Sequence, residues 1–188
     1  MDEAFTAGVN PGGLTDKKEI RILILHILNE VGNPMSLDEM TEAVLSEGCA
    51  NYFELAEALS ELCESECLVE KKNDEGIGVY FTTEKGASAG KVLERDLPLS
   101  VREKATASAK KVLRRRKNEK ENQVKISKTE DGYKISLRVT DIGSDLMELS
   151  LFMPTMEQAV SVRQRFLADP AGTYMQVLEA VTGDSISS

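Results

Sequence analysis

"NYFELAEALSELCESECLVEKKNDEGIGVYFTTEKG" occupies residues 51–86 and decides the fold. Its first part has apolar residues at helical spacing, and Asn51 stands at the cap position with Glu54 three residues later. The runs "CLVEKK" and "GVYFTT" flank "NDEGI", a pattern that predicts two short strands joined as a hairpin. Thr82 or Thr83 then begins another helix. The stretch therefore predicts helix, hairpin and helix in direct succession.

Two further helices are expected before this stretch. The first is opened by Thr15 or Asp16 and closed by Gly32 and Pro34, and the second begins at a capping box of Ser36 and Glu39. Three short helices followed by a hairpin and a helix give the order of a winged helix-turn-helix. On the first helix, Ile22 and Leu25 lie outside the inward stripe. They predict a second contact surface, against another part of the chain or a second copy.

The residues from 98 onward predict a smaller domain. Ser100 and Glu103 form a capping box for a helix to about residue 118, and three strands of alternating apolar residues follow. Two C-terminal helices, with Pro170 at the start of the second, would cover the apolar face of this meander. The expected fold class is α+β, with a winged helix at 14–96 and an α+β domain at 98–182. Residues 1–13 are expected to be a flexible arm and 183–188 a flexible tail.

Charge is distributed unevenly along the chain. The net charge is −9, yet residues 102–128 contain 11 basic and 3 acidic residues, whereas residues 16–95 contain 17 acidic and 8 basic ones. Such asymmetry is typical of a nucleic-acid surface, or of two parts that attract each other. No apolar run reaches the roughly 20 residues that a membrane span needs. The N-terminus does not resemble a secretory signal, so a cytoplasmic protein is expected.

Enzymatic chemistry is not indicated. The chain has a single histidine, His26, and neither a phosphate-binding loop nor a dinucleotide-binding motif. Cys63 and Cys67 lack the spacing of a zinc knuckle and a convincing fourth ligand, so no metal and no cofactor are expected. Three cysteines in all favour reduced thiols over a disulfide framework. His26 lies on the flank of a core helix, where a packed or interfacial histidine is the better interpretation.

Two segments carry a resemblance to known regulators. The stretch "ALSELCESECLVEKK" followed by "VYFTTEKG" resembles winged-helix regulators of the PadR or MarR kind, in which the third helix leads into the wing and a Y-x-x-T-x-x-G stretch opens the next helix. Here that stretch is Tyr80, Thr83 and Gly86. More narrowly, "ILILHILNEVGNPMSLDEMTEAVL", "NYFELAEALSEL", "LPLSVREK" and "MPTMEQA" are similar to an uncharacterised family of predicted winged-helix proteins from Gram-positive anaerobes. The resemblance implies a DNA-binding transcriptional regulator.

The candidate DNA contacts follow from this resemblance and from the positions of the cations. The leading residues of the third helix would lie nearest the groove, although Tyr52 falls on the inward side of the helical wheel, while Phe53, Glu54, Glu57, Ser60, Glu61 and Glu64 point outward. An outward face with this many glutamates repels phosphate, so cations elsewhere would have to provide affinity. The candidate DNA-binding residues are Asn51, Tyr52, Phe53, Glu54, Lys17, Lys18, Arg21, Lys71, Lys72, Lys110, Lys111, Arg114 and Lys117.

Three functions stay open from the residues alone. The first is a cytoplasmic, homodimeric DNA-binding regulator, with Ile22, Leu25, Ala105 and Ala109 as the candidate dimer interface. The second is a winged helix that binds a protein partner through its acidic third helix and Phe53. The third is a ligand sensor, in which the C-terminal domain holds a small molecule. The basic run from Lys110 to Lys120 is compatible with a solvated face, a phosphate contact or a seat for the acidic first domain.

Overall fold

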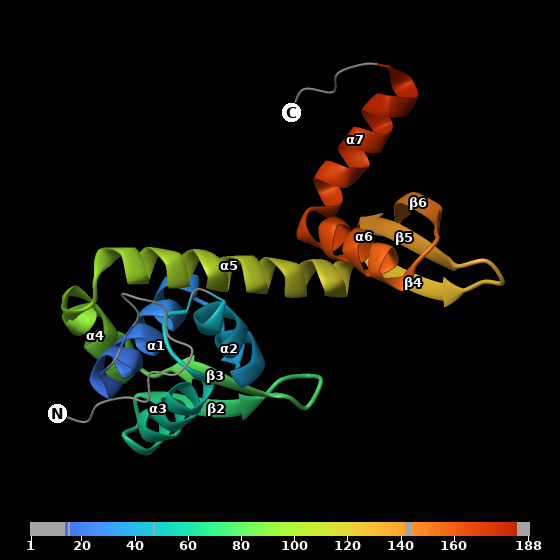
Figure 1. Cartoon of the computed structure of the whole chain (residues 1–188). Helices are drawn as coiled ribbons and strands as arrows, with labels where there is room; N and C mark the ends of the chain where they lie inside the picture. Colours follow the sequence, from blue (N-terminus) through green and yellow to red (C-terminus); the bar gives the residue numbers. More distant parts are fainter. Residues whose placement is uncertain (1–13, 15, 47, 142–143, 184–188) are drawn as a thin grey trace. The chain divides into compact units, whose positions relative to one another are not determined.

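The protein was analysed as a computed structural model that describes residues 14, 16–46, 48–141 and 144–183. Over these residues it is an α+β protein with seven α-helices, one short 3₁₀ helix and two three-stranded antiparallel sheets (Figure 1). Chain contacts divide it into a first unit, Met1–Leu113, and a second unit, Arg114–Ser188. The flexible arm expected at 1–13 and residues 184–188 of the expected tail lie outside the described residues.

The helix starts in the first unit follow the capping residues in the sequence. Asp16 accepts a hydrogen bond from the backbone N–H of Lys18, Ser36 and Glu39 form a reciprocal capping box, and Thr83 caps the fourth helix. The elements, in chain order, are α1 (Lys17–Val31), β1 (Met35–Ser36), α2 (Leu37–Leu45), α3 (Tyr52–Glu64), β2 (Leu68–Lys72), β3 (Gly78–Thr82), α4 (Glu84–Leu93), η1 (Glu94–Asp96) and most of α5 (Leu99–Glu121).

The predicted hairpin is confirmed as β2 and β3, paired from Leu68 opposite Thr82 to Lys72 opposite Gly78. Strand β1 was not predicted, because two residues carry no alternation that a sequence pattern can detect. It pairs with β3 and gives the sheet order β1-β3-β2. Gly86 lets α4 begin close to this sheet, since a Cβ there would lie 1.9 Å from the carbonyl oxygen of Cys67.

Ile22 and Leu25 do not form a surface for a second copy. Their side chains are only 2% and 3% exposed, because α4 packs along α1 and covers them. Gly90 allows this close approach: a Cβ at this position would lie 3.1 Å from the Cβ of Leu25. Of the two alternatives that the sequence left open, contact with another part of the same chain is the one observed. The assignment of these residues to a dimer interface was therefore wrong.

Helix α5 also packs differently from the expectation. Ala105 and Ala109 are fully buried in the core of the first unit, so the thin apolar stripe of this helix is an internal packing seam. The helix begins at Leu99, and the carbonyl of Pro98 accepts the first backbone bonds, so Ser100 is not its cap. The two units separate after Leu113 and not near residue 97, because the first half of α5 is held in this core.

The second unit contains the predicted meander. Strands β4 (Gln123–Lys128), β5 (Tyr133–Asp141) and β6 (Ser144–Met153) pair in that order, with Val124 opposite Leu137 as expected. Helix α6 (Met156–Ala168) covers the apolar face through Ala159, Phe166 and Leu167. Helix α7 (Pro170–Thr182) adds mainly Tyr174 to this cluster and leaves Val181 79% exposed. The prediction that both C-terminal helices cover the sheet is thus correct for α6 and largely wrong for α7.

Membrane insertion has no structural support in the part of the chain that the structure describes, where no helix is both long enough and apolar enough to cross a bilayer.

Candidate nucleic-acid interface

The first turn of α3 is fixed by its own cap. The side-chain oxygen of Asn51 accepts a hydrogen bond of 3.1 Å from the backbone N–H of Glu54, and both residues are only 8% exposed. Capping satisfies a backbone donor that the helix itself leaves without a partner. Asn51 and Glu54 therefore serve the structure of α3, and their burial keeps them from reading a base edge. Their assignment as DNA contacts was wrong, as was the outward placement of Glu54.

Two aromatic residues occupy the exposed start of α3. Phe53 is 73% exposed, as the helical wheel predicted, but Tyr52 is also 42% exposed and does not point inward. Their rings meet edge to face with 5.8 Å between centroids. This pair stabilises both rings in a defined orientation at the surface. Of the four leading residues of the helix, these two are the ones available to a partner.

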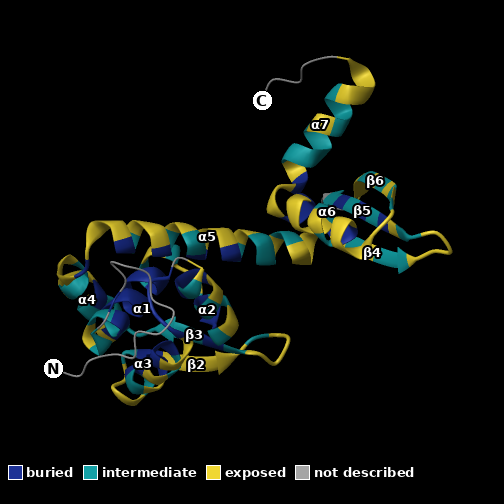
Figure 2. Ribbon diagram, in the orientation of Figure 1, coloured by how far each residue is buried: buried dark blue, intermediate teal, exposed yellow. Residues whose placement is uncertain are grey.

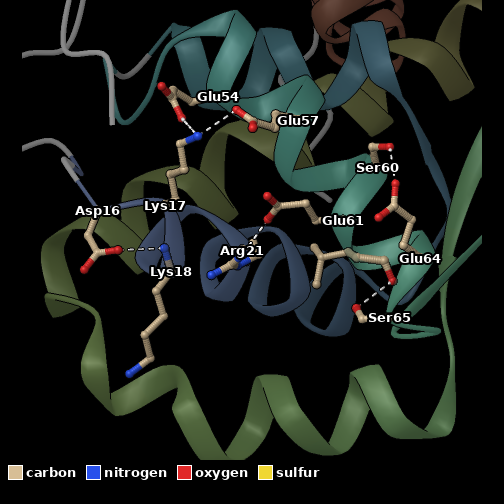
Figure 3. A network of polar contacts seen from close by, with 11 residues as sticks. Asp16, Lys17, Lys18, Arg21, Glu54, Glu57, Ser60, Glu61, Glu64 and Ser65 are labelled. Carbon is tan, nitrogen blue, oxygen red and sulfur yellow. Dashed lines mark hydrogen bonds and ion pairs between the residues drawn. The ribbon is translucent and has the colours of Figure 1, made fainter. Parts of the chain in front are cut away.

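The acidic row of α3 is paired with cations from α1. Lys17 Nζ lies 2.9 Å from Glu57 Oε2 and 4.0 Å from Glu54 Oε2, and Arg21 pairs with Glu61, as Figure 3 shows. Lys17 and Arg21 are four residues apart on α1, and Glu57 and Glu61 are four residues apart on α3. The two helices therefore present matching rows of opposite charge to each other. The outward face of α3 is therefore less anionic than its sequence indicates.

The cations of α1 that were expected to contact DNA are already paired with acidic residues. The hydrogen bond to Glu57 raises the pKa of Lys17, which keeps it charged beside the glutamates. Lys18 lies 3.1 Å from Asp96 of η1. Lys17, Lys18 and Arg21 are thus each engaged with an acidic residue of the first unit. Exposed pairs of this kind contribute little stability, so a phosphate could displace them, but only in competition with a carboxylate.

The β2–β3 hairpin presents two further cations. Lys71 and Lys72 are both exposed, and the Nζ of Lys71 lies 5.6 Å from the centre of the Phe81 ring. The connecting turn is ordered by Asn73, whose side chain accepts bonds from the backbone N–H groups of Glu75 and Ile77. No ion pair involving Lys71 or Lys72 occurs among the described residues. These two lysines are the candidate phosphate contacts nearest the exposed hairpin loop.

The basic run of α5 supplies the remaining candidates. Lys110, Lys111, Arg114 and Lys117 are all exposed. Lys117 forms a surface pair with Glu121 one turn later, with 3.7 Å between nitrogen and oxygen. Lys110 and Lys111 belong to the first unit, whereas Arg114 and Lys117 fall in the second. Exposure leaves the cationic face accessible to a phosphate, without distinguishing that role from an ordinary solvated surface.

The structure places His26 and the cysteines in the fold of the first unit. His26 is 7% exposed, and its Nδ1 lies 3.5 Å from Glu94 Oε2 while its Nε2 lies 3.3 Å from Thr106 Oγ1. The three cysteines are free thiols, and burial raises the pKa of Cys63. No group of three or more metal-binding side chains occurs within the described ranges. The burial of His26 agrees with the first of the two placements expected for it, a packed histidine, rather than an interfacial one.

The sequence-based interpretation missed the charge pairing between α1 and α3. A signal was present, since Lys17 and Arg21 have the same spacing as Glu57 and Glu61. What the sequence does not contain is the side-by-side placement of the two helices, which depends on the whole core. A match of this kind between two helices becomes informative once they are expected to be neighbours.

The chain belongs to a family described as a domain of unknown function, DUF4364, whose model matches residues 20–181. No curated protein and no solved structure matches the chain. The family match assigns no activity, so the resemblance to PadR and MarR regulators stays a prediction.

Proposed function

We propose that the chain is a DNA-binding transcriptional regulator whose first unit is a winged helix. The observation that carries the proposal is the order α1, β1, α2, α3, β2, β3 with β1 paired to β3. In a winged helix this arrangement directs the third helix toward the major groove and leaves the hairpin beside it. Here the exposed start of α3 carries Tyr52 and Phe53, and the hairpin carries Lys71 and Lys72.

The α1–α3 pairs support this proposal, because they lower the main electrostatic objection to it. A row of uncompensated glutamates on α3 would repel the phosphate backbone. With Glu57 beside Lys17 and Glu61 beside Arg21, the net charge of that face falls toward zero. Lys71 and Lys72 can then contribute phosphate contacts, while an exposed aromatic residue of α3 contacts an apolar base edge such as a thymine methyl group.

The decisive experiment is binding to a random pool of duplex fragments at several salt concentrations. Replacing Lys71 and Lys72 with Ala should weaken binding to all sequences and reduce the salt slope by about two, one for each lost phosphate contact. The matched control replaces Lys128 and Lys134 with Ala, two exposed lysines of the second unit. Wild-type affinity and slope in the Lys71/Lys72 variant would contradict the proposed docking of the hairpin.

Protein binding through α3 is the second candidate, and Phe53 specifically favours it. A 73% exposed phenylalanine with an ordered aromatic neighbour is typical of an anchor in a protein interface. The acidic character of the helix favours this candidate less than the sequence suggested, because Glu57 and Glu61 are paired with cations of α1. Replacing Phe53 with Ala separates the two: a DNA regulator should lose preference among sequences, whereas a protein-docking module should show no sequence-enriched DNA binding even in the wild type.

A homodimer and a cytoplasmic location are parts of the same proposal. Regulators that bind two-fold symmetric sites do so as two-fold dimers. The burial of Ile22, Leu25, Ala105 and Ala109 means that any dimer must form through other residues. Light scattering at micromolar concentration gives the mass directly, and a monomer mass would contradict the dimer.

A further inference from the structure

A cavity of about 410 Å³ lies in the first unit between α1, η1 and α5. Its volume falls in the range of small-molecule sites, roughly 300–1,000 Å³. The charged side chains that line it have both signs: Arg102 and Lys110 are basic, while Glu30, Glu94 and Glu103 are acidic. Leu99 and Ala107 add apolar surface to the lining. The cavity therefore offers complementary contacts to a small molecule that carries two opposite charges.

Arg102 is a lining side chain that has a buried donor without a partner among the described residues. It is only 20% exposed, and its ion pair with a described residue is a contact of 3.8 Å between Nη1 and Glu94 Oε1. Its Nε–H is buried without a hydrogen-bond acceptor. A buried donor without an acceptor is unfavourable, and a planar guanidinium suits the two oxygens of a carboxylate. The Nε itself is out of reach of solvent, so a ligand carboxylate in the cavity would bind the accessible part of the guanidinium, whose contact with Glu94 is loose.

Part of the lining has a purely structural explanation. The contacts of His26 with Glu94 and Thr106 link α1, η1 and α5, and they would serve to hold these three elements together without any ligand. That explanation leaves out Glu30 and Glu103, which line the same cavity and form no ion pair with any described residue. Two exposed carboxylates without an ion pair to a described residue and a loosely paired guanidinium line the same cavity, and they match an ammonium group and a carboxylate group, respectively.

We propose that this cavity binds a free α-amino acid. Arg102 holds the ligand carboxylate, Glu30 and Glu103 hold the ammonium group, and the side chain of the ligand lies toward Leu99 and Ala107. His26 and Glu94 are positioning residues, since their mutual contact fixes the wall beside Arg102. The site shares Lys110 with the basic run of α5 but includes none of Tyr52, Phe53, Lys71 and Lys72, so it would exist whether or not the protein binds DNA.

The test measures thermal stabilisation of the full-length protein by each of the 20 standard amino acids at millimolar concentration, followed by calorimetry on those that stabilise it. We expect at least one amino acid to raise the unfolding temperature of the first unit. Analogues of that amino acid that lack either the amino group or the carboxylate should bind at least about tenfold more weakly, since each loses one charged contact. No stabilisation by any amino acid, or equal binding of the singly charged analogues, would overturn the proposal.

Two variants locate the site. R102Q should reduce affinity for the amino acid by about tenfold or more, while K111Q, an exposed position on α5 outside the cavity, should not change it. If R102Q does not fold, E30Q provides the same information, because Glu30 is exposed on α1 and its substitution leaves the core unchanged. E30Q should weaken binding of the amino acid but leave binding of the analogue without an amino group unchanged. Wild-type affinity in these variants would place any binding elsewhere and overturn the assignment.

Discussion

The two units of the chain bury their apolar residues to different depths, as Figure 2 shows. Among the residues that the structure describes, the core cluster of the first unit contains 24 buried apolar residues and that of the second contains five. The rest of that cluster, including Met147, Leu149 and Leu151 on β6, is only partly buried. The first unit therefore depends on packing in many places. The second depends on the hydrogen bonds of its sheet and on a single covering helix, so one lost contact should affect it more.

The largest expected effect is the replacement of Phe166, the largest buried side chain of the second unit. Phe166→Ala should cost about 3–5 kcal/mol, which is enough to unfold a unit with so small a core. Leu23→Ala, at a fully buried position of the first unit, should cost about 2–5 kcal/mol but leave that unit folded. Hydrogen exchange, read separately for the two units, measures both results.

The control for Phe166 is Phe152→Ala. This side chain is 56% exposed on β6, so the same chemical change should cost much less. If Phe166→Ala accelerates exchange equally in both units, then the second unit does not unfold on its own, and the contrast between the two cores is wrong.

The next effect tests close backbone packing in the first unit. In Gly86→Ala, the new Cβ would overlap the carbonyl oxygen of Cys67, a backbone atom that cannot move without displacing β2. Overpacking of this kind costs about 1–3 kcal/mol, and more where the backbone resists. Thermal unfolding measures the loss. Ser88→Ala, an exposed position on the same helix, is the control and should change stability by less than about 0.5 kcal/mol.

Substitutions of N-cap residues compare the two units through the loss of the same kind of hydrogen bond. Asn51→Ala at α3 and Thr155→Ala at α6 each remove one hydrogen bond to a backbone N–H, which costs about 1 kcal/mol. In the first unit the loss should appear as fraying of the first turn of α3 alone. In the second unit it should raise exchange throughout α6 and the strands beneath it, because α6 is the main cover of the sheet. Equal, local effects at both caps would contradict this difference.

The sequence predicted local features well because these depend on neighbouring residues. The caps at Asp16, Ser36, Asn51 and Thr83 and the β2–β3 hairpin are where the patterns indicated. Features that depend on distant residues were not predictable in this way. The burial of Ile22 depends on α4, some 60 residues away, and the charge of α3 depends on Lys17 and Arg21 of α1.

In the candidate site, too, features that depend on neighbouring residues were predicted and those that depend on distant residues were not. Exposure of Phe53 and of the lysines on the hairpin and α5 followed from the helical and strand patterns. Tyr52 and Glu54 exchanged their expected faces, since a helical wheel assigns an average direction and not the contacts at the first turn. No pattern indicated the cavity beside Arg102, because its residues come from three elements that only the fold brings together.

Alkaline pH should give the smallest effect and should act on the first unit. Three residues there have raised pKa values: Lys17 through its hydrogen bond to Glu57, and Cys63 and Tyr80 through burial, with Glu70 adding to both. In each case the folded unit keeps its proton to a higher pH than the unfolded chain does. Their contribution to stability is therefore complete below the ordinary pKa values, about 8.5 for cysteine and about 10 for tyrosine and lysine, and is lost as pH rises through the raised values.

The expected result is a decrease in the unfolding temperature of the first unit between about pH 8 and about pH 11.5, which spans the ordinary pKa values of cysteine, tyrosine and lysine, larger than any decrease in the second unit. In the second unit, Arg163 pairs with Glu119 at 3.2 Å, and arginine does not lose its proton in this range. The pair of Lys117 with Glu121 is exposed and contributes little stability. Lys17→Arg keeps a cation beside Glu57 that does not titrate in this range. Tyr80→Phe removes a second titrating group. The double variant should therefore lose less stability at high pH than the wild type does. Hydrogen exchange or unit-specific unfolding at the two pH values measures the difference. A larger alkaline loss in the second unit would mean that these three residues do not control the response.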